Sequence, residues 1–270
     1  MTSWTTREGK TPPCSPLLFT ESMPAMKTPP TPQLLNIVDC NLRAVRETIA
    51  AAHDRAGRTD PLPLLVAVTK YAQPDWIQAL YALGERDFGE NRPQQLQARQ
   101  QVFLEEYGFN DIRWHLIGQL QRNKARHMLE LATCIHSADS LKLLSHLDRL
   151  ADEMALRPKI LLQVNVSGET TKSGFTPEQV TLAIPELADF QHLDITGLMT
   201  MAPYTSDQPA IRAVFRGLRE LRDRMREQLP ELMPLRELSM GMTNDFEIAV
   251  EEGATLVRVG SGLFENCDQG

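Results

Sequence analysis

The feature that most constrains the fold is a series of eight short apolar runs, each followed by a helix-like stretch. The runs are continuous rather than alternating in hydropathy, which is typical of parallel strands buried on both faces. Eight such units in series predict an α/β fold of the closed, single-domain (β/α)8 TIM-barrel type. The runs occupy residues 64–70, 87–91, 113–118, 133–137, 159–166, 194–201, 237–242 and 255–260.

The segments between the runs carry helix start and stop signals. Thr176 followed by a proline predicts the start of one helix, and Pro185 predicts its end or a kink. A helix over residues 34–57 precedes the first strand and is expected to cover part of the barrel. Further helices are predicted at residues 73–84, 93–107, 122–132, 140–156, 207–228 and 244–252.

Length and composition favour one domain. The chain has 270 residues, of which 42% are hydrophobic, and this suits one barrel of about 200–250 residues with a short extra segment. Residues 1–32 are rich in proline, serine and threonine and lack the apolar core of a signal peptide, so they are expected to form a disordered leader. The predicted domain is therefore residues 33–270, a barrel with an amino-terminal helix.

Charge and cysteine usage exclude several classes of protein. The net charge is −7 and the arginines are scattered, which argues against a nucleic-acid partner. No apolar run approaches the roughly 20 residues that span a bilayer, so no membrane partner is expected. Cys14, Cys40, Cys134 and Cys267 form no CxxC pair, which predicts no metal site, no disulfide framework and a reducing cytoplasm.

Lys70 closes the first run, at the end of a predicted strand where barrel enzymes place their chemistry. Partial desolvation in a barrel mouth favours the neutral amine, which attacks aldehydes. A strand-end lysine that merely extends its ammonium group into water is the alternative interpretation. Position alone leaves both interpretations open.

The last two runs end in glycine and small hydroxyl residues, at 239–243 and 258–262. Such residues let backbone N–H groups approach a phosphate, and the loops after the last two strands are the usual phosphate site of a barrel. The alternative is that the glycines only permit tight turns. Asn91 and His115 lie at two other strand ends, where a lone histidine is more often a core residue than a catalyst.

Seven segments resemble, in order, the motifs of one known family. They read VAVTK (66–70), FGENR (88–92), WHLIGQLQRNK (114–124), LQVNVSGETTKSGF (162–175), GLMTMAP (197–203), SMGMTNDFEIAVEEGAT (239–255) and VRVGSGLF (257–264). This series is similar to the YggS/PROSC family, also called the pyridoxal phosphate homeostasis proteins. Two positions depart from the family pattern, since Arg92 replaces a common tyrosine and Glu265 replaces the usual glycine.

The resemblance implies a barrel similar to the amino-terminal domain of alanine racemase, which is fold type III among proteins that bind pyridoxal 5′-phosphate (PLP). It implies that PLP is the cofactor and that Lys70 binds it covalently through a Schiff base. Asn91 and Met199 match the family residues that line the ring.

The same motifs imply the remaining contacts with the cofactor. Ser239, Gly241, Gly260 and Ser261 correspond to the phosphate loops. Arg258 resembles the family arginine that faces the pyridine nitrogen. A cation at this place disfavours protonation of that nitrogen, so the ring becomes a weaker electron sink.

These implications predict a monomeric, cytoplasmic, non-catalytic protein that buffers PLP or delivers it to PLP-dependent apoenzymes. The chain ends shortly after the last strand, so no second domain that could supply an opposing base is expected. A PLP-dependent amino-acid racemase or decarboxylase is the first alternative. A barrel enzyme that acts on a sugar phosphate is the second, although it would give Lys70 no aldehyde partner.

Overall fold

The structure is a computed structural model that describes residues 29–169, 172–228 and 234–269. Its strands pair in parallel in sequence order, and β1 pairs with β8 to close the barrel. The predicted (β/α)8 fold is thus confirmed. The strands are β1 (Leu64–Val68), β2 (Asp87–Glu90), β3 (Arg113–Leu116), β4 (Cys134–Ala138), β5 (Lys159–Gln163), β6 (Asp194–Met199), β7 (Glu237–Ser239) and β8 (Leu256–Val259).

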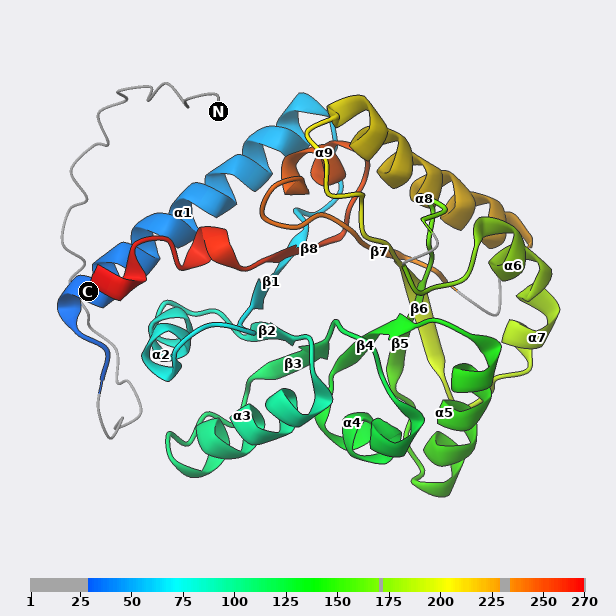
Figure 1. The fold of residues 1–270 in the computed structure, drawn as a ribbon, viewed down its shortest axis with the longest axis horizontal. Helices are drawn as coiled ribbons and strands as arrows, with labels where there is room; N and C mark the ends of the chain where they lie inside the picture. The colour runs from blue at the N-terminus through cyan, green and yellow to red at the C-terminus, as the bar shows by residue number, and fades with distance from the viewer. Residues whose placement is uncertain (1–28, 170–171, 229–233, 270) are drawn as a thin grey trace.

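Helices alternate with the strands and surround the barrel (Figure 1). The α-helices are α1 (Pro32–Arg55), α2 (Pro74–Ala82), α3 (Pro93–Glu105), α4 (Ala125–Leu131), α5 (Leu141–Glu153), α6 (Pro177–Leu182), α7 (Ile184–Ala188), α8 (Gln208–Gln228) and α9 (Phe246–Glu251). The short 3₁₀ helices are η1 (Arg122–Lys124), η2 (Ser261–Leu263) and η3 (Cys267–Gln269). No helix within the described ranges is both long and apolar enough to cross a membrane.

Helix α1 begins with a side-chain cap and contacts the carboxyl-terminal segment of the chain. The Thr31 hydroxyl accepts a hydrogen bond of 3.1 Å from the Leu34 amide, so the last residues of the predicted leader form the helix start. Residues 1–28 of that leader lie outside the described residues. The Asn41 side chain donates to the carbonyls of Leu263 and Glu265, which keeps the carboxyl-terminal segment beside α1 (Figure 1).

Alternation along the strands separates an apolar shell from a partly polar interior. Phe88 packs against Trp114, and Trp114 packs against Phe103 of α3. Both strand residues occupy outward positions, because side chains alternate between the two faces of a strand. Inward-facing Leu161 and Met199 form a small apolar cluster with Cys134. Polar side chains fill much of the remaining interior, and this bears directly on the site.

Element ends differ from the sequence prediction where loops pack tightly. Strand β7 ends at Ser239 instead of residue 242, because Gly241 adopts a left-handed φ of 92° that ends extended structure. The predicted kink at Pro185 is confirmed as a break between α6 and α7 at Ala183. The first turn of the helix predicted at residues 122–132 is the 3₁₀ helix η1.

Candidate cofactor-binding site

Lys70 lies at the carboxyl-terminal mouth of the barrel, just beyond β1. Val66 and Val68 occupy inward positions of that strand, so the same alternation directs Lys70 toward the barrel axis. The side chain is half-buried, and its Nζ atom lies 5.2 Å from the ring centroid of Tyr71. The Lys70 carbonyl accepts a hydrogen bond of 2.8 Å from Gln95 of α3. The backbone that carries the amine is therefore tied to a helix.

A buried ion pair supports the same turn from outside the barrel. Glu90 is fully buried and accepts a hydrogen bond of 2.6 Å from the Thr69 hydroxyl. It also forms an ion pair with Arg99, with 2.9 Å between Nε of Arg99 and Oε1 of Glu90. Arg99 also donates to the Ala72 carbonyl at 2.8 Å. Burial raises the pKa of Glu90, and its contacts with Thr69 and Arg99 oppose that effect. These contacts hold both sides of the Lys70 turn.

Two glycines let the loops after β7 and β8 approach their neighbours closely. A Cβ atom on Gly241 would lie 2.6 Å from the Cβ of Ala249 in α9, which leaves no room for a side chain. A Cβ atom on Gly260 would lie 3.2 Å from the Val68 carbonyl oxygen. Gly260 thus lets its loop lie against β1, the strand that leads to Lys70.

These two loops carry backbone N–H groups that have no partner among the described residues. Within the described ranges, the backbone N–H groups of Thr243, Asn244 and Ser261 donate to no protein acceptor. The Thr243 hydroxyl is half-buried and accepts a hydrogen bond of 3.3 Å from the Gly260 amide. Successive backbone amides in loops can form an anion-binding cradle. Thr243 belongs to the run 239–243 that predicted this loop, but it was not among the predicted site residues.

Arg258 projects inward from β8 and is 3% exposed. Its guanidinium donates to the Ser239 hydroxyl at 2.6 Å and to the Thr200 carbonyl at 2.9 Å. Burial lowers the pKa of Arg258 to about 10, and the Asp245 carboxylate opposes that shift, so the side chain stays charged at neutral pH. Ser239 is 0% exposed. The structure therefore places this serine beneath Arg258 rather than on the surface of the loop.

A chain of buried side chains continues from Ser239 across the barrel interior. His136 Nδ1 lies 2.8 Å from the Ser239 hydroxyl, and His136 Nε2 lies 3.0 Å from His115 Nδ1. His115 Nε2 lies 3.0 Å from Asp87 Oδ1, and the half-exposed Arg113 pairs with the same carboxylate. We call Asp87, His115, His136 and Ser239 the interior polar chain.

Surroundings fix the charge of two members of this chain. Burial alone would raise the pKa of Asp87, but hydrogen bonds from Arg113 and His115 outweigh it and lower the pKa to about 2. Burial, together with the neighbouring His115 and Arg258, lowers the pKa of His136 well below its ordinary value. At neutral pH Asp87 is thus a carboxylate and His136 is an uncharged imidazole.

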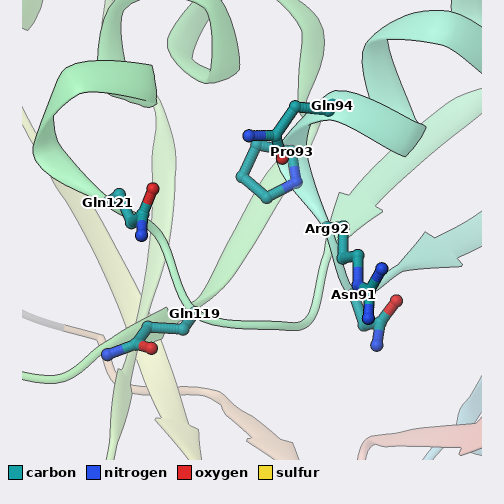
Figure 2. A pocket seen from close by; sticks show the side chains of 6 residues that line it. All are labelled: Asn91, Arg92, Pro93, Gln94, Gln119 and Gln121. Atoms are coloured by element: carbon teal, nitrogen blue, oxygen red, sulfur yellow. The ribbon is translucent and has the colours of Figure 1, made fainter.

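The two residues predicted to line the ring flank the mouth. Met199 is buried and lies opposite Ser239 in the β6–β7 pairing. Asn91 follows β2 and belongs to a cavity of about 260 Å³ beside the mouth (Figure 2). The side chains that line this cavity are Asn91, Arg92, Pro93, Gln94, Gln119 and Gln121. The predicted site residues therefore come from five different strands or the loops after them.

The amine, the amide cradle and the charged guanidinium together fit a phosphorylated carbonyl compound. An unprotonated lysine forms a covalent bond with an aldehyde, and backbone amides beside glycines bind phosphate. A fixed cation beneath them suits an electron-rich ring atom. The donor set thus agrees with the cofactor that the sequence motifs imply.

Comparison with known proteins connects this chain to one family. Residues 40–266 match the family model described as alanine racemase, N-terminal domain. The chain is 36% identical over 223 residues to the pyridoxal phosphate homeostasis protein of Aquifex aeolicus, covering 83% of this chain and 95% of that protein. It is 39% identical over 204 residues to the protein of the same name from Synechocystis, covering 76% and 91%.

Solved structures agree with this similarity. PipY of Synechococcus elongatus with PLP bound superposes with a TM-score of 0.74 at 37% identity, covering 84% of this chain and 99% of PipY. Alanine racemase of Clostridium difficile superposes with a TM-score of 0.66 at 13% identity, covering 85% of this chain and 56% of the racemase. The second likeness shows a shared barrel fold.

Proposed function

This chain belongs to the family of pyridoxal phosphate homeostasis proteins, and on that premise we propose that it binds PLP and buffers or delivers it without catalytic turnover. One observation supports the proposal: a half-buried amine, a charged guanidinium and backbone amides that have no protein acceptor within the described ranges belong to three neighbouring strands, β1, β8 and β7, or to the loops after them. PLP-dependent apoenzymes would receive the cofactor from a monomeric, cytoplasmic protein.

Lys70 would hold the cofactor covalently through Nζ. When bound, PLP supplies an aldehyde carbon and an electron-withdrawing ring. The amides of Thr243, Asn244 and Ser261 would bind its phosphate, since they have no protein acceptor within the described ranges. The Gly260 backbone lies against β1 and so brings this cradle close to Lys70.

The ring would lie between the remaining predicted residues. Arg258 would face the pyridine nitrogen, with Asn91 and Met199 beside the ring. Gly241 shapes the loop that carries the phosphate donors. The buried position of Ser239 favours support of Arg258 over direct contact with phosphate.

Two properties of the site favour storage and exchange over chemistry on amino acids. The charged Arg258 disfavours a protonated pyridine nitrogen, which weakens stabilisation of a carbanion. The side chains of Tyr71 and Tyr204, in the loops after β1 and β6, extend into solvent, since Tyr71 is 84% exposed and Tyr204 is 99% exposed. These two side chains therefore do not shield the mouth from water, and carbanion chemistry benefits from the exclusion of water.

Absorption spectroscopy with borohydride trapping tests the covalent site. We expect the purified protein to bind PLP with a visible absorption band, and peptide mapping after reduction to recover the pyridoxyl group on Lys70. The Lys70→Ala variant should lose the covalent product, whereas Lys142→Ala on α5 should retain it. Recovery of the group mainly on Lys172, near the same mouth, would contradict the assignment to Lys70.

An exchange assay separates the binding protein from the racemase alternative. We expect no D/L exchange of alanine or serine by the PLP-loaded protein. Exchange that disappears in Lys70→Ala, and is therefore not due to a contaminant, would establish the enzyme instead.

A further inference from the structure

The two ends of the interior polar chain fix which atoms donate. A guanidinium has no acceptor, so the 2.6 Å contact between Arg258 and Ser239 makes the serine oxygen the acceptor. At the other end, Asp87 is ionised and paired with Arg113, so its oxygens can only accept. His115 must therefore donate to Asp87 from Nε2.

This constraint propagates through both rings. When His115 carries a single hydrogen, on Nε2, its Nδ1 is bare, and His136 then donates to it from Nε2 across the 3.0 Å contact. His136 Nδ1 is then bare and accepts from the Ser239 hydroxyl at 2.8 Å. The hydrogen bonds thus run in one direction, from Arg258 to Asp87.

We propose that the interior polar chain is a one-directional hydrogen-bond relay that positions Arg258 for the cofactor. Asp87 sets the tautomer of His115 and, through it, that of His136. The Ser239 hydroxyl is then directed at His136 and presents only lone pairs to Arg258. His115 and His136 are positioning residues in this scheme, which rests on the proposed function for its link to PLP.

If the hydrogen bonds ran in the opposite direction, the Ser239 hydroxyl would be oriented differently beside Arg258. With hydrogens on both Nδ1 atoms, His136 would donate to Ser239, which would already accept from Arg258. The serine hydrogen would then be free to turn away from the ring. The carboxylate of Asp87 excludes this arrangement, because it would face a bare Nε2 of His115.

A metal site is the competing explanation for two facing imidazoles. His115, His136 and Cys134 offer ligand atoms within 4.8 Å of one another, all from buried side chains. Binding a cation would require bare inner nitrogens on both rings and hence a hydrogen on Nδ1 of His136. Burial raises the pKa of the Cys134 thiol, which disfavours the thiolate that binds metals. The hydrogen-bonded relay needs neither change.

Nitrogen-15 NMR of the cofactor-free protein tests the direction of the relay. We expect both His115 and His136 to carry their single hydrogen on Nε2. Asp87→Leu, which removes the terminal acceptor, should give a mixture of tautomers at His136, a residue that does not contact Asp87. Arg113→Gln is the matched control, because it removes the ion pair but leaves the carboxylate, and it should preserve both tautomers.

The same spectra test whether the relay positions Arg258. His136→Leu removes the donor to His115 and the acceptor of the Ser239 hydroxyl, so the Arg258 side-chain resonances should shift and broaden. His136→Gln, whose amide supplies both an N–H donor and a carbonyl acceptor, should restore them in part. If Asp87→Leu fails to fold, Ser239→Ala serves instead: it should disturb Arg258 while both tautomers persist. A hydrogen on Nδ1 of His136 in the parent, or tight Zn²⁺ binding to the parent, would overturn the relay.

Cofactor retention is the last measurement. The dissociation constant for PLP should rise about tenfold in His136→Leu and less in His136→Gln, as expected for loss of one buried hydrogen-bond partner. Equal affinity in the parent and His136→Leu would overturn the positioning role. Failure of the parent to bind PLP would contradict the proposed function alone, because the tautomers are measured without cofactor.

Discussion

At the scale of single residues, two buried histidines occupy positions inside the barrel where apolar side chains are usual. Both His115 and His136 are at most 4% exposed, yet each ring nitrogen has a hydrogen-bond partner. Hydrogen bonds to all four ring nitrogens offset the free energy that is lost when the imidazoles are removed from water. For His136, that balance holds only while the ring stays uncharged.

Acid should therefore destabilise the protein through His136. Its pKa is lowered in the folded state, so below its ordinary value of about 6.5 only the unfolded chain binds this proton. The free energy of unfolding should fall by about 1.4 kcal/mol for each pH unit below that value. Asp87 does not contribute between pH 7 and 5, because its lowered pKa matters only in stronger acid.

Urea unfolding of cofactor-free protein at pH 7, 6 and 5 measures this effect. His136→Gln removes the titrating group, so its stability should decline less steeply between pH 6 and 5 than that of the parent. Parallel profiles for the two proteins would show that His136 accepts a proton in the folded state.

Thr243 offers a test of the phosphate cradle. Thr243→Val keeps the side-chain volume but removes the hydroxyl beside the Gly260 amide, and we expect the dissociation constant for PLP to rise about tenfold. Thr181→Val on the outer helix α6 is the control and should bind PLP like the parent. Equal affinity in both variants would show that backbone donors alone hold the phosphate.

Sequence reasoning found some of these residues and missed others for physical reasons. Lys70 could be predicted as a site residue from the sequence because it ends an apolar run. The role predicted for Arg258 came from a family resemblance instead. His136 was missed because His115 is 21 residues away and comes near only when β3 pairs with β4. Counting inward positions along both strands would have placed the two rings on the same side of the sheet.

At the scale of elements, the loop after β7 depends on a glycine for two separate reasons. Gly241 has a φ of 92°, and a Cβ there would overlap Ala249 of α9. Gly84, after α2, has a φ of 95° but open space around it. The two positions therefore separate backbone strain from crowding.

Alanine at each glycine should reveal the difference. Gly84→Ala should cost about 1–2 kcal/mol from its left-handed conformation, whereas Gly241→Ala should cost about 2–5 kcal/mol because overpacking adds to the strain. Urea unfolding measures both values. Equal losses would show that α9 moves away without cost.

The ion pair behind the Lys70 turn should matter more than ion pairs on the surface. Arg99→Met would leave Glu90 buried without its charged partner, which we expect to cost about 3–5 kcal/mol. Arg126→Met breaks the exposed pair with Glu153 and should cost at most about 1 kcal/mol. Comparable losses in urea unfolding would indicate that Glu90 becomes protonated or finds water.

Apolar periodicity predicted the elements better than their ends. Each predicted helix and strand is present within the described ranges, because period and burial follow from the same side chains. The short β7 and the 3₁₀ turn η1 were not foreseen. The early end of β7 depends on the left-handed Gly241, whose backbone lies against α9, and local sequence does not encode that contact.

At the scale of the whole molecule, PLP should stabilise the folded chain by mass action. At a free concentration one hundred times the dissociation constant, the free energy of unfolding should rise by about 2.7 kcal/mol. Pyridoxine 5′-phosphate lacks the aldehyde, so at the same concentration it should stabilise the parent less. In Lys70→Ala the two compounds should act alike, and a persisting difference in thermal unfolding would place the covalent bond elsewhere.

The interior polar chain also constrains how this barrel can change over time. Its four members come from β2, β3, β4 and β7, so one substitution leaves buried groups on other strands without a partner. Replacing the whole set by apolar residues of similar volume would restore a satisfied core, as replacement of buried polar sets often does. Sequences in which only some of the four residues are replaced should be the least stable, because they leave buried polar groups without partners. Substitutions at these four positions should therefore be strongly epistatic, and the set should be inherited or lost as a unit.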